Sequence, residues 1–322
     1  MSEQLVTVAV TTYNSAPFVE ETLNSILTQD WPRIELIVSD DASSDATIAR
    51  AEQWLSQHGS KFESVQVLTV PSNTGVPANC NRIIAAARSN FIKFIAGDDL
   101  LLPGCIRNNM NYIQQHPDAG VIFSQVELFT DEYLPVNIQG MRPAQFPNNI
   151  MHPSLTAADQ YKLQLLCDRI SFTPSYFFNR ELILSLGGYD ESMKLVEDYP
   201  MWLKVTRAGY RLHYFHQPTV AYRQHSRALN NISAPVLFKP LYLKSSELKE
   251  RYVYPNLPWD LAGAERIRVF FAKLFDKVGL NKDRKITKIL YQLITIYLNP
   301  YQYIIAIKKR YVSVCKNDIF YR

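Results

Sequence analysis

Apolar and polar residues alternate in blocks along the N-terminal third of the chain. Three apolar runs rich in β-branched residues, at 5–10, 34–38 and 91–95, have the length of buried strands. Between the first two runs, Phe18 and Ile26 mark apolar positions at helical spacing. This alternation of strand and helix predicts an α/β fold with a mostly parallel sheet and flanking helices. Ligands of such a sheet bind at the carboxyl ends of its strands.

Two of the predicted strands end in adjacent carboxylates, Asp40 with Asp41 and Asp98 with Asp99. Buried adjacent acids are costly unless a cation joins them, and Mg²⁺ uses one or two carboxylates and fills its other positions with waters and phosphate oxygens. The pairs therefore favour binding of a nucleotide diphosphate, although a solvated acidic turn is the alternative for either pair alone. No Gly-rich phosphate loop occurs in the sequence, which argues against dinucleotide oxidoreductases and P-loop enzymes.

Five short blocks in fixed order carry a resemblance to a known family. They are residues 6–45, 73–82, 95–100, 187–191 and 197–202. Together they resemble the inverting family-2 glycosyltransferases of the GT-A fold, over roughly the first 225 residues. The resemblance implies a metal-dependent hexosyltransferase that moves a sugar from a nucleotide-diphospho-sugar, with a UDP-sugar expected, to a saccharide acceptor. It also implies a β-glycosidic product, and a role in polysaccharide or O-antigen synthesis.

The resemblance assigns a role to each residue of the nucleotide-sugar site. Thr11 and Tyr13 are expected to frame the pocket for the base and ribose. Asp41 is expected to accept a hydrogen bond from a uracil-like N–H, with Asp40 as its partner or rival. Asn79 lies where the family places a polar or basic residue of the donor site.

The same resemblance gives a metal site for Mn²⁺ or Mg²⁺. Asp99 is the expected metal ligand, and Asp98 faces the ribose or the metal. The family's D-x-D pattern would place an acid at Ala96, which this chain lacks, so we expect weak affinity for the ion in the absence of donor. Arg223 is expected to hold a diphosphate oxygen and His225 to reach the metal or phosphate, with a basic surface turn as the alternative.

Asp198 is the candidate catalytic base. Displacement of a nucleoside diphosphate with inversion requires a group that removes the proton of the acceptor hydroxyl. Glu197 and Asp198 precede an apolar helix start with Pro200 in its first turn, where the helix dipole favours ionised acids. An ordinary acidic helix cap is the alternative, and the position within the five blocks favours Asp198 as the base. Glu197 is left as an orienting residue or a plain first-turn acid.

Two other functions compete with glycosyl transfer. A sugar nucleotidyltransferase would need a Gly-rich N-terminal loop with Arg and Lys, which the sequence lacks. A non-catalytic nucleotide- or glycan-binding protein on the same fold would not need Asp99 and Asp198. Release of nucleoside diphosphate with and without acceptor would separate the three.

The C-terminal part differs in charge from the rest. Residues 251–322 hold 14 Lys and Arg against 5 Asp and Glu, a net of +9, so that residues 1–250 carry −5 of the overall +4. Segments 266–275 and 286–298 have the pattern of amphipathic helices. This favours attachment to an anionic membrane surface, with packed helices that expose a basic face as the alternative. No nucleic-acid-binding motif accompanies the charge, so nucleic acid is not an expected partner.

These features give the expected organisation of the chain. Residues 1–230 should form the GT-A domain, divided into a nucleotide-sugar-binding half at 1–100 and an acceptor-binding half at 101–230, and residues 231–322 a basic, aromatic-rich helical extension. Residues 135–153 are predicted as a loop over the acceptor side.

The expected location is the cytoplasm, peripheral on the inner face of the cell membrane. The sequence starts without a secretory-signal pattern, and its four cysteines form no C-x-x-C pair. The acceptor would then be a saccharide linked to a polyprenyl diphosphate.

Overall fold

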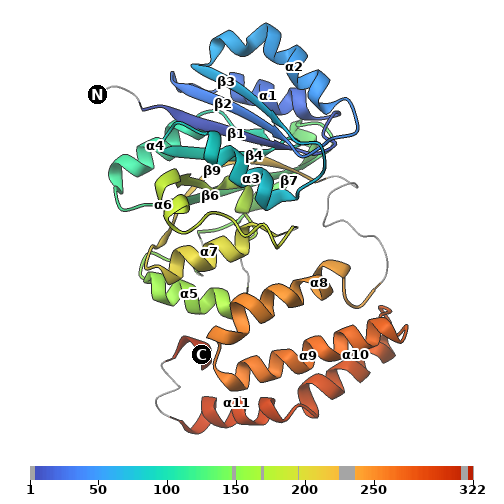
Figure 1. Ribbon diagram of the computed structural model, residues 1–322. Coiled ribbons are helices and arrows are strands. Elements are labelled where there is room, and N and C mark those ends of the chain that lie inside the picture. Colours follow the sequence, from blue (N-terminus) through green and yellow to red (C-terminus); the bar gives the residue numbers. More distant parts are fainter. Residues whose placement is uncertain are drawn as a thin grey trace. The chain divides into compact units, whose positions relative to one another are not determined.

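The computed structural model describes residues 4–146, 150–167, 170–194, 196–224, 236–312 and 318–321. The chain divides into two compact units, and Figure 1 colours it along the sequence. Unit 1 contains residues 1–160 and 169–225, and unit 2 contains residues 161–168 and 226–322. The domain boundary that we predict at residue 230 lies outside the described residues and stays a prediction.

Within the described residues, a nine-stranded sheet forms the centre of unit 1. Its strands are β1 (Val6–Thr12), β2 (Ile34–Asp40), β3 (Ser64–Thr69), β4 (Phe91–Ala96), β5 (Leu100–Leu101), β6 (Val121–Thr130), β7 (Ile138–Arg142), β8 (Phe177–Asn179) and β9 (Leu212–Gln224). The order is β3-β2-β1-β4-β8-β6-β9-β5, with β7 paired to β6. The long ladders are parallel, and β5, β7 and β8 join in antiparallel pairs. The predicted α/β fold with a mostly parallel sheet is confirmed.

Helices flank this sheet (Figure 1). They are α1 (Val19–Leu27), α2 (Thr47–His58), α3 (Val76–Ala86), α4 (Cys105–Gln115), α6 (Arg180–Ser185) and α7 (Asp198–Arg207), with 3₁₀ turns at Gly59–Lys61, Pro135–Asn137 and η3 (Thr173–Ser175). The boundary between the two units falls within α5 (Ala157–Leu166). In α1 the buried residues include Val19, Leu23 and Ile26, which form the face that packs on the core. Of the two positions read from the sequence, Ile26 belongs to this face, whereas Phe18 is the residue before the helix and is partly buried.

The register of the sheet brings the polar strand ends level. Thr11 of β1 lies opposite Ser39 of β2 on one side and Ala96 of β4 on the other. Thr12 lies opposite Asp40. The residues that follow these three strands therefore meet at one edge of the sheet.

The expectation of a loop over residues 135–153 is wrong in part. Strand β7 occupies Ile138–Arg142 and pairs antiparallel with Val126–Phe129 of β6. Its sequence lacks an apolar alternation, and its side chains are partly or fully exposed, so the backbone ladder to β6 defines it. Residues 147–149 lie outside the described residues.

Unit 2 is helical where it is described, as predicted. It contains α8 (Pro240–Leu248), η4 (Lys249–Val253), η5 (Tyr254–Asn256), α9 (Trp259–Lys277), α10 (Lys285–Gln292), η6 (Leu293–Tyr297), α11 (Pro300–Tyr311) and η7 (Ile319–Tyr321), of which η4 and η6 are π-helical. The buried carboxylate of Asp260 on α9 accepts from Lys308 Nζ at 2.9 Å and Tyr321 Oη at 2.8 Å, which ties α9 to α11 and η7. Among the described helices, none combines the length and the apolar content that crossing a membrane requires.

Candidate active site

The turns that follow β1 and β2 interlock. The N–H of Asn14 donates to Ser43 Oγ at 2.8 Å, and Asn14 Oδ1 accepts from the N–H of Ser44 at 2.9 Å. Asn14 and Ala42 both have positive φ, 52° and 64°, a conformation that non-glycine residues hold only where the surroundings enforce it. These bonds hold the two turns in a fixed position at the carboxyl ends of β1 and β2, and we call this pair of turns the rim.

Thr11 and Tyr13, the residues predicted for the base and ribose pocket, lie at this rim. Thr11 is partly buried at the end of β1, whereas the side chain of Tyr13 is 54% exposed. An exposed tyrosine on a fixed turn offers a ring face on which a nucleobase could stack. Their placement is compatible with the predicted role and does not test it.

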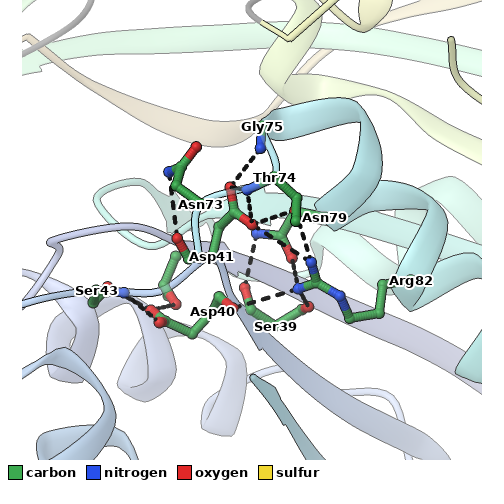
Figure 2. A network of polar contacts seen from close by, with 10 residues as sticks. Ser39, Asp40, Asp41, Ser43, Asn73, Thr74, Gly75, Asn79 and Arg82 are labelled. Carbon is green, nitrogen blue, oxygen red and sulfur yellow. Dashed lines mark hydrogen bonds and ion pairs between the residues drawn. The ribbon is translucent and has the colours of Figure 1, made fainter. Parts of the chain in front are cut away.

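Asp40 is buried and serves the turn that follows it. Its carboxylate accepts from Thr12 Oγ1 at 2.7 Å and from the N–H of Ser43 at 2.7 Å (Figure 2). These bonds join the ends of β1 and β2. The sequence left Asp40 as either the partner of Asp41 or its rival. These bonds favour the role of partner.

Asp41 is buried beside it but has different donors (Figure 2). Its carboxylate accepts from the N–H of Thr74 at 3.0 Å, from the N–H of Gly75 at 2.7 Å and from Thr74 Oγ1 at 2.5 Å. Burial alone would raise the pKa of Asp41, but these hydrogen bonds and one from Arg82 outweigh it and hold the pKa below its ordinary value. Asp41 is therefore an ionised anchor for the turn before α3, with much of its acceptor capacity in use.

Arg82 and Asn79 of α3 complete the network in Figure 2. Arg82 donates to Ser39 Oγ at 3.0 Å, Asn79 Oδ1 at 3.1 Å and Thr74 Oγ1 at 3.0 Å. Asn79, which is buried, donates through Nδ2 to the carbonyl of Ser39 at 3.0 Å. Asn79 thus holds α3 to the end of β2, and its predicted contact with the donor stays a prediction.

The end of β4 packs closely on the end of β1. The N–H of Gly97 donates to the carbonyl of Thr11 at 2.9 Å, and a Cβ at position 97 would lie 2.8 Å from Thr12 Cγ2. Only glycine permits this approach. The two acids that follow differ in exposure, because Asp98 is partly exposed whereas Asp99 is 2% exposed.

The Asp99 carboxylate faces the protein. Its Oδ1 accepts from the N–H of Arg223 at 2.9 Å, and burial together with the charge of Asp98 raises the pKa of Asp99 well above its ordinary range. The structure thus favours Asp98 over Asp99 as the residue of this pair that meets a ligand.

A divalent cation fits this strand end in part. Asp98 offers the hard oxygen that Mn²⁺ or Mg²⁺ prefers, and the position of Ala96 adds no second acid. Among the described residues, no cluster of three or more His, Cys, Asp or Glu side chains could hold a metal by itself. His225, the other predicted ligand, lies outside the described residues.

Arg223 at the end of β9 is buried and bound to the protein. Its Nε donates to the carbonyl of Asp98 at 2.8 Å, and its other nitrogens donate to the carbonyl of Asp131 and the carboxylate of Glu21. The guanidinium also lies over the ring of Phe129, 4.5 Å from its centroid. The predicted diphosphate contact is untested, and the observed role is to hold the Asp98 turn against β9.

Glu197 and Asp198 lie at the start of α7, partly exposed. The Asp198 carboxylate accepts from the N–H of Tyr199 at 2.7 Å and from Thr173 Oγ1 at 3.0 Å. Burial raises the pKa of Asp198, and burial with the neighbouring Asp198 charge raises the pKa of Glu197 to about 8. A carboxylate with a raised pKa is a stronger base, as proton removal from a hydroxyl requires.

Sequence reasoning missed Lys93, which supports the segment that holds Asp198. Lys93 is fully buried on β4, and its Nζ donates to the carbonyls of Pro174 at 2.6 Å and Tyr176 at 3.2 Å. Burial lowers the pKa of Lys93 to about 8. These bonds fix η3, which carries Thr173. The available signal was a lysine inside an otherwise apolar strand, flanked by Ile92 and Phe94.

Helix α3 joins the nucleotide-side blocks to the acceptor-side blocks. Asn81 Oδ1 accepts from the N–H of Tyr189 at 2.8 Å, and Asn81 Nδ2 donates to the carbonyl of Tyr189 at 2.9 Å. A Cβ at Gly188, which has φ of 68°, would lie 2.8 Å from Asn81 Oδ1. The next turn toward the N-terminus contributes the N–H of Val76, which donates to the carbonyl of Lys194 at 3.2 Å. Together with the contacts of Asp41 and Gly97 described above, these bonds bring four of the five sequence blocks together. The four are residues 6–45, 73–82, 95–100 and 187–191.

Comparisons with known proteins agree with this geometry. The model of a family described as Glycosyl transferase family 2 matches residues 7–179. The putative glycosyltransferase EpsE of Bacillus subtilis is 25% identical over 71% of this chain and 76% of its own length. An uncharacterized Mycobacterium tuberculosis protein is 26% identical over 63% of this chain, and the match spans 62% of that relative, less than two thirds of its length.

Solved structures share the fold. S. aureus TarS 1–349 in complex with UDP-GlcNAc superposes with a TM-score of 0.59 at 19% identity, covering 94% of this chain and 83% of that one. The mannosyltransferase PcManGT from Pyrobaculum calidifontis, in complex with GDP-Man and Mn²⁺, gives a TM-score of 0.52 at 20% identity, covering 97% and 77%. At this level of identity the likeness shows the GT-A type of fold.

Proposed function

Because the chain belongs to glycosyl transferase family 2, we propose that it is an inverting enzyme that moves a sugar from a UDP-sugar to a saccharide acceptor and forms a β-glycosidic bond. The carrying observation is that one compact unit holds both the level polar ends of β1, β2 and β4 and the Glu197–Asp198 pair at the start of α7. The first group suits a donor nucleotide and the second suits proton removal from an acceptor.

The donor side is supported by the fixed turns and by relatives of the same fold. Tyr13 presents an exposed ring on a rigid rim, and Asp41 holds the turn before α3. The TarS structure contains UDP-GlcNAc, and the PcManGT structure contains GDP-Man. We favour a uridine nucleotide because the resemblance places Asp41 opposite a uracil-like N–H, and the identity of the sugar is left to the donor screen below.

The metal proposal is Mn²⁺ or Mg²⁺ held with Asp98 as the contacting carboxylate. Bound there, the ion would neutralise charge that develops on the diphosphate leaving group. Asp99 and Arg223 would then position Asp98 without contacting the ion. The N–H of Arg223 holds the Asp99 carboxylate, and the Arg223 guanidinium holds the carbonyl of Asp98.

In the proposed mechanism Asp198 is the base. Its carboxylate takes the proton of the acceptor hydroxyl while the hydroxyl oxygen bonds to the anomeric carbon. The bond from that carbon to the diphosphate oxygen breaks, and the nucleoside diphosphate leaves with the electron pair. Attack opposite the leaving group inverts the anomeric configuration. Thr173 orients Asp198 through its hydroxyl.

For the acceptor we propose a saccharide linked to a polyprenyl diphosphate, used in polysaccharide or O-antigen synthesis at the inner face of the cell membrane. The support is the basic charge of residues 251–322 and the exposed apolar side chains of unit 2. A sugar nucleotidyltransferase or a non-catalytic binding protein is disfavoured, because the family match covers the donor side and the sequence carries both Asp98 and Asp198.

The test is release of UDP from a panel of UDP-sugars, with and without a lipid-diphosphate-linked disaccharide. Transfer predicts that release depends on acceptor and that nuclear magnetic resonance of the product shows a β linkage. A nucleotidyltransferase would instead release pyrophosphate from a nucleoside triphosphate and a sugar phosphate. Binding of UDP-sugar without turnover under any acceptor would contradict the enzymatic assignment.

A further inference from the structure

In unit 2, the helical segment formed by α10 and η6 buries two threonines and exposes most of its apolar residues. Thr287 and Thr295 are buried together with Asn299, just beyond the segment. The exposed side carries Ile286, Ile289, Leu293, Ile296, Tyr297 and Leu298, which we call the apolar face. Ile286 is 78% exposed and Leu298 is 67% exposed. A helix that packs on a water-soluble core normally turns most of its apolar residues inward.

The buried hydroxyl groups of Thr287 and Thr295 have hydrogen-bond partners, so the fold accommodates them on the inward side. Thr287 Oγ1 donates to the carbonyl of Arg284 at 2.8 Å, and Thr295 Oγ1 donates to the carbonyl of Tyr291 at 2.8 Å. Tyr291 Oη donates to the carbonyl of Arg268 on α9 at 2.9 Å. The segment is thereby attached to the rest of unit 2 without use of its apolar face. An exposed apolar surface of this kind marks an interaction site.

The charge around the apolar face indicates its partner. Residues 282–312 hold 7 Lys and Arg against 1 Asp, a net of +6. Several of these cations lie in or just before the first turn of α10, where the helix dipole makes a positive charge unfavourable. Lys309 and Arg310 lie in the last turn of α11, which also exposes Ile307 and Tyr311, whereas Lys308 is bound to the buried Asp260. Long cationic side chains beside apolar and aromatic residues suit the phosphate level of a bilayer.

We propose that the apolar face, with the cations that flank it, lies in the headgroup region of an anionic lipid bilayer. The apolar side chains reach the acyl boundary while the Lys and Arg side chains meet lipid phosphates. This rests on the peripheral location proposed above and names the surface responsible for it. It is independent of the sugar-transfer assignment, because lipid binding is measured without donor or acceptor.

The experiment measures co-sedimentation of the full chain with phosphatidylcholine vesicles that contain or lack phosphatidylglycerol. We expect binding to anionic vesicles that weakens with salt. The double variant Leu293→Glu with Ile296→Glu should lose at least about tenfold in affinity, because two apolar contacts are replaced by charges that the lipid repels. Lys282→Gln with Lys285→Gln should weaken binding about fivefold per lysine.

Val136→Glu is the control for an added acid, since it places one glutamate on an apolar residue of unit 1 that is 82% exposed. It should bind as the wild type does. All substituted side chains are exposed, and equal thermal unfolding midpoints would show intact folds. Equal vesicle binding by the Leu293→Glu, Ile296→Glu variant would overturn the proposal, as would equal binding to neutral vesicles. A wild-type dimer that binds no vesicles and becomes monomeric in the double variant would instead assign the apolar face to a second copy of the chain.

The vesicle result and the enzymatic result are separable. Transfer to a short water-soluble acceptor should be unchanged in the Leu293→Glu, Ile296→Glu variant, whereas transfer to a vesicle-embedded acceptor should fall with vesicle binding. Loss of binding with no transfer by any protein form would leave the lipid surface supported and contradict the proposed function alone.

Discussion

At the residue scale, the acids of the site differ in the donors around them. Asp41 receives hydrogen bonds from Thr74, Gly75 and Arg82, so its charge is stabilised despite burial. Glu197 and Asp198 adjoin each other and have fewer donors, so burial dominates and raises both pKa values. Replacing the carboxylate by an amide should therefore affect nucleotide binding at Asp41 and the chemical step at Asp198.

Asp198→Asn preserves size but removes basicity. Transfer should fall by roughly 10² to 10⁴, the usual range for a general base, while UDP affinity stays near the wild-type value. Calorimetric titration of UDP beside transfer rates at saturating donor gives the comparison. A variant that transfers at nearly the wild-type rate would exclude Asp198 as the base and direct attention to Glu197.

Asp41→Asn should show the converse pattern. Its amide nitrogen would meet the N–H groups of Thr74 and Gly75, so a buried hydrogen bond is lost and the free energy of unfolding should fall by about 1–3 kcal/mol. UDP affinity should weaken more than the chemical step, because the turn before α3 shapes the ground-state pocket. Denaturant unfolding and calorimetry measure the two effects, and unchanged UDP affinity would contradict the donor assignment.

Glu197 gives a pH prediction for stability. Its pKa is about 8 in the fold, above the ordinary value of 4.5, so the folded state keeps a proton that the unfolded state releases between these values. The group's contribution to the free energy of unfolding is therefore full below about pH 4.5, declines as pH rises and is lost above about pH 8. Glu197→Gln should remove this decline and be more stable than the wild type at pH 8 by about 1–2 kcal/mol. The prediction is contradicted if the unfolding midpoints of the wild type and Glu197→Gln depend on pH in the same way.

At the element scale, the buried Lys93 holds η3, and η3 in turn positions the base Asp198 through Thr173. Lys93→Met removes the ammonium that holds the carbonyls of Pro174 and Tyr176, so Thr173 loses its fixed position. We expect kcat to fall about tenfold or more with little change in UDP affinity, and the protein to lose about 1–3 kcal/mol of stability.

Thr173→Val separates positioning from stability in that prediction. The Thr173 hydroxyl stabilises ionised Asp198, so its removal should raise the pKa of Asp198 further. The rise of kcat with pH should then shift to higher pH in Thr173→Val, with the fold intact. An unshifted pH profile in this variant would show that η3 has only a structural role.

Elements were more predictable from sequence than contacts. The parallel strands and α1 follow from apolar runs and helical spacing, because burial of those residues decides the element. Strand β7 escaped prediction since pairing with β6 defines it. The polar ends of β1, β2 and β4 lie level as the sequence predicts, and the roles of the site residues stay predictions. The exposure of Asp98 rather than Asp99 and the protein partners of Arg223 depend on side-chain directions that only the fold determines. Lys93 was missed because burial of a lysine needs carbonyl partners distant in sequence.

At the scale of the whole molecule, thermal unfolding reports on donor and metal together. Mn²⁺ should raise the unfolding midpoint clearly in the presence of UDP and little when added alone, because one exposed carboxylate binds the ion weakly without phosphate oxygens. Asp98→Asn should abolish the increment from Mn²⁺ with UDP and reduce transfer. Asp99→Asn should leave that increment in place, since its side-chain oxygen can still accept from the N–H of Arg223. The reverse pattern would restore Asp99 as the ligand.

The unbroken ladders of β1 with β2 and β4 restrict how this enzyme can change in evolution or by design. Inserting one residue inside β1 would reverse the facing of every later side chain in the strand and separate Thr12 from Asp40. A substitution of an exposed residue in the turns after the strands leaves this register intact. Altered donor preference is therefore accessible through substitution of Tyr13, whose ring is exposed, whereas the strand lengths and the hydrogen-bonded turns must be kept.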